Sequence, residues 1–136
     1  IHMKLFSFMA VLLLVSFTEN SQNMIGYKAD DIINYMADNR RDMNMEKVNN
    51  KSFRYLKYSD KYDTQTMLFF LSPDSVCQNI RLVCNSSIKD AKIKELDSSY
   101  SKSGKNRWID NRSGKNYYIR LDDDEWSFTI TIEPEK

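Results

Sequence analysis

The chain has 136 residues, of which 41% are hydrophobic and 12% aromatic; it is long enough for one domain and too apolar to be disordered. Its 20 basic and 19 acidic side chains give a net charge of +1, so there is no global reason to expect binding to nucleic acid or to an anionic membrane. The sole histidine, His2, lies in a tripeptide typical of a cloning remnant, so we expect no histidine-based catalysis and no histidine metal site.

The first segment has the charge pattern of a secretory signal peptide. Lys4 is followed by 13 uncharged residues that end at Phe17, and polar residues come next. As a helix this run would span about 20 Å, short of the ~30 Å hydrocarbon core of a bilayer. We therefore expect residues 1–21 to be a cloning remnant and a signal peptide, and the protein to be exported to the periplasm or secreted, with no stable membrane span after cleavage. A buried core helix and an uncleaved membrane anchor are the alternatives.

Residues 22–136 are expected to form a single domain that opens with a helix. Apolar residues recur at helical spacing from Ile25 to Met36, with aspartates in the first turn and arginines at the end. The polar residues 42–50 predict a loop. Three strand patterns follow, the last two joined by a Pro-Asp turn into a hairpin: 52–58, 66–71 and 76–84. A helix that begins at Pro73 is the alternative.

A second helix and three more strands are expected in the second half. Ser86 or Ser87 can cap a helix that ends near Ser99, after which a polar stretch with a glycine breaks the chain. The three strand patterns are 107–110, 116–121 and 126–132. In the last strand four residues share one face: Trp126, Phe128, Ile130 and Ile132. The expected fold is α+β, an antiparallel sheet of about six strands in helix-βββ-helix-βββ order with two helices packed on one face.

Two features could carry chemistry, and a structural role is favoured for both. Cys77 and Cys84 match no zinc or redox spacing, and on a regular strand or helix they lie beyond disulfide reach. We expect Cys84 to be a small buried side chain and Cys77 to lie near a turn, with their pairing left open. The acidic run 122–125 is expected to be a solvated turn rather than a Ca²⁺ or Mg²⁺ site. We expect no metal site and no cofactor.

The sheet face that points away from the helices is the strongest candidate for binding. Alternation predicts these residues on it: Arg81, Tyr118 and Arg120, joined by Arg54 and Tyr58 if the aromatic residues beside them face inward. Arginine and tyrosine are enriched at interface hot spots, although long side chains also cover ordinary exposed sheets. Basic and aromatic residues interleave elsewhere too, but acidic residues interrupt the positive field, so nucleic acid is not an expected partner.

Two parts of the chain carry a resemblance to known proteins. One is the short signal peptide followed by residues 25–33. The other is the C-terminal run of Leu96–Tyr100, Arg107-Trp108, Tyr117–Ile119 and Phe128–Ile130. Together they resemble small uncharacterised exported proteins of gut-type Gram-negative bacteria. The Gly-plus-helix opening is also similar to the repeat unit of periplasmic BamE-like and β-lactamase-inhibitor-like modules, which implies binding of other proteins and no catalysis. The usual small-residue helix end is missing, so no binding residue is carried over.

These observations predict an exported, non-enzymatic module that binds a protein partner through its open sheet face. The alternatives are a small periplasmic hydrolase or ligand-binding protein that uses carboxylates or lysine, and an envelope-associated structural protein. A flat surface of arginine and tyrosine favours the binding module. Carboxylates or a buried lysine converging in a cleft favour the enzyme.

Overall fold

The structure, a computed structural model, describes residues 23–46 and 54–136. The expected cloning remnant and signal peptide, residues 1–21, lie outside the described residues. The elements are α2 (Ala29–Asn39), β1 (Met43–Glu46), β2 (Tyr55–Asp60), β3 (Gln65–Leu71), β4 (Cys77–Asn85), the 3₁₀ turn η1 (Ser86–Ile88), α3 (Lys89–Ser99), β5 (Ser101–Gly104), β6 (Arg107–Asp110), β7 (Tyr117–Asp123) and β8 (Ser127–Pro134).

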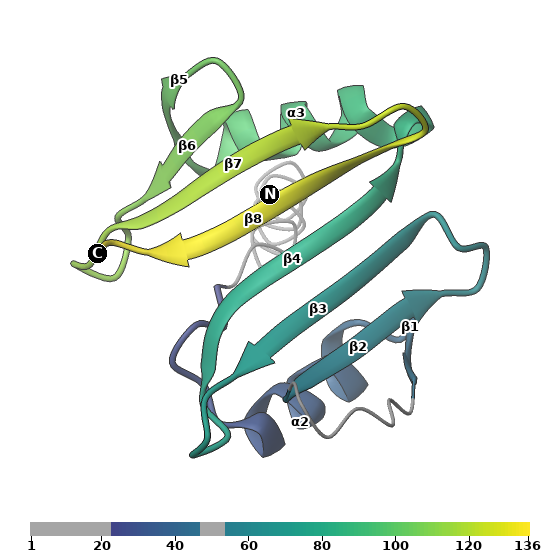
Figure 1. Cartoon of the computed structure of the whole chain (residues 1–136), viewed down its shortest axis with the longest axis vertical. Helices are drawn as coiled ribbons and strands as arrows, with labels where there is room; N and C mark the ends of the chain where they lie inside the picture. The colour runs from purple at the N-terminus through teal and green to yellow at the C-terminus, as the bar shows by residue number, and fades with distance from the viewer. Residues whose placement is uncertain (1–22, 47–53) are drawn as a thin grey trace, which may run out of the picture.

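All eight strands form one antiparallel sheet in the order β1-β2-β3-β4-β8-β7-β6-β5 (Figure 1). Each half of the chain supplies one α-helix and then four antiparallel strands. The strand order is symmetric about the β4–β8 pair, with β1 at one edge of the sheet and β5 at the other. Among the described strands the halves pair only through β4 and β8, from Ile80↔Ile132 to Asn85↔Ser127. The protein therefore folds as two α-ββββ units joined along one strand pair.

The expected count of about six strands in helix-βββ-helix-βββ order is wrong because it misses β1 and β5. β1 lies within the stretch 42–50 that was expected to be a loop, and β5 lies in the polar break after α3. Both are four-residue edge strands in which only Met43 is buried, so their hydrophobic pattern is too short to predict a strand. They form because their backbone groups pair with β2 and β6. The alternative helix at Pro73 is also absent, since β4 occupies Cys77–Asn85.

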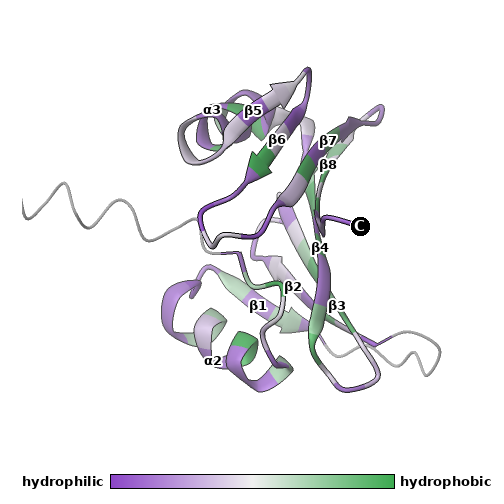
Figure 2. Cartoon of the chain, turned by 90° about the vertical axis from the view of Figure 1, so that its left-hand side faces the viewer, coloured by the Kyte–Doolittle hydropathy of each residue, from purple (hydrophilic) through white to green (hydrophobic). Residues whose placement is uncertain are grey.

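Both helices pack on the same face of the sheet, each over its own half (Figure 2). The α2 cluster joins helix and strand residues: Ile32, Met36, Met43, Tyr58, Phe69, Cys77 and Ile80. The α3 cluster does the same: Cys84, Leu96, Trp108, Ile119, Leu121, Phe128 and Ile130. Ile132 packs against both clusters, so the two halves share one continuous core beneath the helices. Neither α2 nor α3 has the length and apolar character needed to cross a bilayer, and the described residues contain no other α-helix.

A hydrogen bond from a buried indole fixes α3 to the sheet. The helical segment is capped by Asn85 rather than by a serine, because the Asn85 Oδ1 accepts the N–H of Ser87 at 2.9 Å. Near the other end of α3, Trp108 of β6 is only 1% exposed and its Nε1 donates to the Asp97 Oδ1 at 2.8 Å. A buried donor without an acceptor is costly, so this contact determines how α3 sits on β6.

We expect Asp97→Ala to lower the free energy of unfolding by about 1–3 kcal/mol, because the Trp108 N–H loses its acceptor. Asp97→Asn keeps an oxygen at the same position and should retain most of the stability. Urea unfolding followed by tryptophan emission measures both variants. Equal stability of Asp97→Ala and the parent chain contradicts this role.

Candidate binding face

The sheet face opposite the helices, here called the outer face, is covered by no described helix (Figure 2). The register places one row of side chains across it, each the cross-strand partner of the next: Lys57, Leu68, Arg81, Thr131, Arg120 and Arg107. Arg81, Tyr118 and Arg120 lie on this face, as the alternation predicted. Thr131 is 3% exposed because it stands between the two long arginine side chains.

Arg81 lies among apolar side chains on the outer face. Its guanidinium carbon is 5.4 Å from the centroid of the Phe70 ring, and that ring is 6.0 Å from the Tyr55 ring. Leu68 and Val83 lie beside Arg81 in the register and are half-buried, although no described helix covers them. These five residues are the Arg81 patch. Among the described residues Arg81 pairs with no carboxylate, so its charge is available to a partner.

The charge of Arg120 is already compensated within the chain. Its Nη1 donates to the Glu133 Oε1 at 2.7 Å and its Nε donates to the Asp122 Oδ2 at 3.1 Å, and these hydrogen bonds raise the pKa of Arg120. The Tyr118 hydroxyl donates to the Glu135 Oε1 at 3.1 Å, which raises the pKa of Tyr118. Tyr118 and Arg120 are therefore held by carboxylates of the chain itself, whereas Arg81 has no carboxylate partner among the described residues.

Arg54 and Tyr58 do not belong to the outer face, which corrects the expectation for both residues. Tyr58 is 4% exposed and packs edge-to-face against Phe69 in the α2 cluster, with ring centroids 5.9 Å apart. The prediction required Tyr55 to face the helices. The alternation of β2 instead places Tyr55 on the outer face and Tyr58 on the helix side. Arg54 precedes β2, and its Nη1 donates to the Pro73 carbonyl oxygen at 2.7 Å. It therefore clamps the β3–β4 turn at one end of the sheet.

Two aromatic side chains are highly exposed, and for Trp126 this corrects the expected position on the core face. Trp126 is 78% exposed, although the alternation placed it on the core face with Phe128. β8 begins only at Ser127, so Trp126 belongs to the β7–β8 turn and escapes the alternation. The acidic residues just before it were the available signal, since they already indicated a turn. Tyr62, in the β2–β3 turn, is 79% exposed.

The acidic run 122–125 is only partly a turn. Asp122 and Asp123 extend β7, where they pair with Arg120 and with Lys89 of α3, the latter at 2.7 Å. Asp124 and the next residue form the turn itself. Within the ranges 23–46 and 54–136, no group of three His, Cys, Asp or Glu side chains is arranged to hold a metal ion.

A hollow of about 920 Å³ lies between the start of β4, the β6–β7 turn and the C-terminal end of β8. Polar side chains from three segments line it, among them Gln78, Asn79, Lys115, Asn116, Glu133 and Glu135. Both carboxylates of this lining are engaged, Glu133 by Arg120 and Glu135 by Tyr118. The hollow therefore offers no pair of free carboxylates for acid–base work.

The two cysteines are buried and form no disulfide with each other. Cys77 lies in the α2 cluster at the start of β4, and Cys84 lies in the α3 cluster, as expected for a turn-proximal and a small buried residue. A register shift between Phe70 and Leu71 lets both thiols face the core despite their odd spacing. Burial raises the pKa of Cys77 to about 12 and that of Cys84 to about 11, so neither is a thiolate at neutral pH.

We expect iodoacetamide to modify both thiols slowly in the folded protein from pH 7 to pH 10 and rapidly in urea. Folding raises both pKa values, so the unfolded thiols ionise first as the pH rises and the free energy of unfolding should fall above about pH 9. Mass spectrometry of timed samples measures the modification. Rapid alkylation of the folded chain at pH 8 contradicts the burial of these groups.

Comparisons with protein-family models, curated proteins and solved structures find no match to this chain.

Proposed function

We propose that the mature chain is an exported, non-enzymatic module that binds a partner protein through the outer face of its sheet. The observation that carries this proposal is the Arg81 patch, in which an unpaired guanidinium stands among half-buried apolar side chains. Such a combination is typical of interface hot spots, because the apolar area supplies affinity and the charged group supplies orientation.

The charges of the outer face indicate an acidic partner surface. Arg81 and Arg107 have no carboxylate partner among the described residues, whereas Lys57 and Arg120 have one or two each. Arg107 and Arg120 are cross-strand neighbours that border a hollow of about 180 Å³ on the same face. A carboxylate on the partner can accept hydrogen bonds there in the bidentate geometry that guanidinium favours. We therefore expect an apolar segment flanked by aspartate or glutamate.

The proposal that the chain is not an enzyme is supported by what its polar groups already do. Glu133 and Glu135 are engaged by Arg120 and Tyr118, and burial keeps the Cys77 thiol protonated. Export rests on the N-terminal pattern alone. N-terminal sequencing of the protein recovered from its native cells tests it: a start near residue 19 or 22 supports export, and an intact leader overturns it.

We expect Arg81→Glu to weaken capture of the partner about tenfold or more, because it reverses the one open charge within the apolar patch. Lys94→Glu makes the same change in charge on α3, on the helix side of the sheet, and should leave capture unchanged. The measurement is affinity capture from periplasmic extract with the mature protein, followed by titration of the partner that is identified. Alanine at Arg81, Tyr118 and Arg120 should act in the same direction without changing the fold.

Equal capture by Arg81→Glu and the parent chain removes the outer face as the binding surface. Recovery of no partner, together with metal-dependent hydrolysis of a generic ester by the purified protein, overturns the binding function itself. Circular dichroism of each variant shows whether the sheet is intact, so that loss of binding is not confused with unfolding.

A further inference from the structure

Two exposed aromatic side chains lie on neighbouring turns at one end of the sheet. Tyr62 lies in the β2–β3 turn and Trp126 in the β7–β8 turn, and both turns flank the end of β4 (Figure 1). The Asn85 N–H donates to the Thr64 carbonyl oxygen at 2.9 Å, and the Ser86 N–H donates to the Trp126 carbonyl oxygen at 3.2 Å. Since the two donors belong to adjacent residues, the two oxygens are at most about 10 Å apart. The backbone therefore holds the two turns within the footprint of a single ligand.

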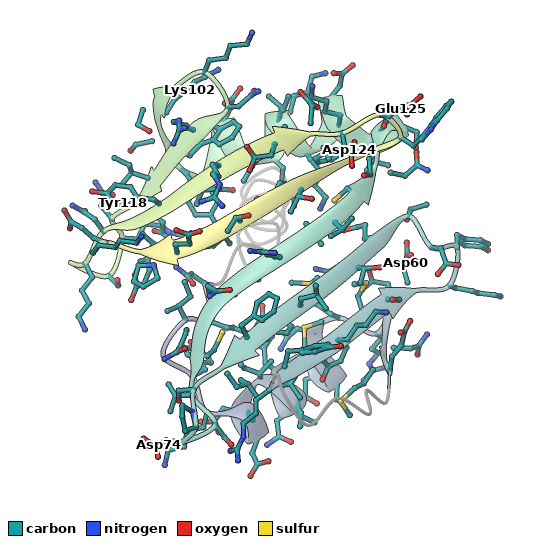
Figure 3. All side chains as sticks on the ribbon, in the orientation of Figure 1. Asp60, Asp74, Lys102, Tyr118, Asp124 and Glu125 are labelled. Atoms are coloured by element: carbon teal, nitrogen blue, oxygen red, sulfur yellow. The ribbon has the colours of Figure 1, made fainter. Side chains whose placement is uncertain are left out.

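Three carboxylates without ion-pair partners among the described residues lie next to these two aromatic residues in the chain. Asp63 follows Tyr62 directly, and Asp124 and Glu125 precede Trp126 at the tip of the β7–β8 turn (Figure 3). None of the three carboxylates forms an ion pair with a described residue, whereas both aspartates at the end of β7 are paired with basic side chains. The free negative charge of this region is thus concentrated beside its two exposed rings.

We propose that this end of the sheet, the hairpin-tip site formed by Tyr62, Asp63, Asp124, Glu125 and Trp126, binds a cationic peptide segment rich in arginine or lysine. A partner that covered the two rings would also cover the carboxylates, and desolvating them without a counter-charge is costly. Guanidinium and ammonium groups satisfy both features, because they pair with carboxylates and are attracted to aromatic faces. The position of the Lys61 Nζ, 5.8 Å from the Tyr62 ring centroid, shows that a cation can approach this surface.

The hairpin-tip site is independent of the proposed outer-face function. It uses other residues and the opposite charge, since the outer face carries unpaired arginines and the hairpin tips carry unpaired carboxylates. Loss of one binding activity in a variant therefore leaves the other available as a control.

The two tryptophans of the chain make the test direct. Trp108 is buried and Trp126 is exposed, so acrylamide quenching of the native protein reports mainly on Trp126. We expect a hexa-arginine peptide to protect this emission from quenching in a saturable manner and to shift it to shorter wavelength, with weaker binding as salt is added. A hexa-glutamate peptide and a neutral Gly-Ser peptide of equal length should do neither.

The variants locate the site with a labelled hexa-arginine peptide and fluorescence anisotropy. Trp126→Ala combined with Tyr62→Ala should weaken binding about tenfold or more, and Asp124→Asn with Glu125→Gln should act likewise. The matched control is Asp74→Asn, which removes a carboxylate from the turn at the opposite end of the sheet (Figure 3) and should leave binding unchanged. These side chains are exposed, so the emission of Trp108 should report an intact fold in every variant.

Three results overturn the proposal. The first is that Trp126 stays open to acrylamide at saturating hexa-arginine, or that the tip variants bind as tightly as the parent chain. The second is protection by a neutral oligosaccharide such as maltohexaose but not by hexa-arginine, which assigns the rings to a sugar. The third is a concentration-dependent dimer that Trp126→Ala abolishes, which assigns the surface to a second copy of the chain.

Discussion

The antiparallel pairing of β4 with β8 is the constraint on which the rest of the molecule depends. Without it each α-ββββ unit would be a four-stranded sheet with an open inner edge, and open edges invite pairing with other chains. The β4–β8 pairing closes the inner edge of each unit and brings the helix-facing sides of the two units together, so that Ile132 contacts both core clusters. It also extends the outer face without interruption from one half to the other, which creates the row that contains Arg81 and Arg120.

Local ion pairing gives the surfaces a charge that the composition conceals. A net charge of +1 indicates no preference for a charged partner, yet Arg81 and Arg107 lie on the outer face without a carboxylate partner among the described residues, and Asp63, Asp124 and Glu125 lie at two hairpin tips without a basic one. At the β7–β8 tip, Arg120 and Lys89 neutralise Asp122 and Asp123, which leaves Asp124 and Glu125 as the carboxylates without an ion pair there. Local pairing, rather than total charge, therefore decides which partner each surface can accept.

Burial decides the chemistry of the groups that look most reactive in the sequence. The register shift opposite Leu71 turns Cys77 into the core, and Cys84 is buried in the other cluster. Desolvation then disfavours the thiolate in both positions, so the residues that most resemble nucleophiles serve as packing. Polar function is left to the surfaces, where the side chains that can meet a partner are arginine, carboxylate and aromatic groups.

By itself the sequence determined the α+β class, the presence of a helix through Met36, the bounds of β6 and the outward position of Arg81, Tyr118 and Arg120, because side-chain period is a local property. Only the tertiary structure decided the rest. β1 and β5 exist through backbone pairing with a neighbour, and with Met43 as their one buried side chain they show too little pattern to predict it. The inward position of Tyr58 and the exposure of Trp126 depend on where a strand begins, which pairing sets, and the approach of the two hairpin tips depends on residues more than 20 positions away in the chain.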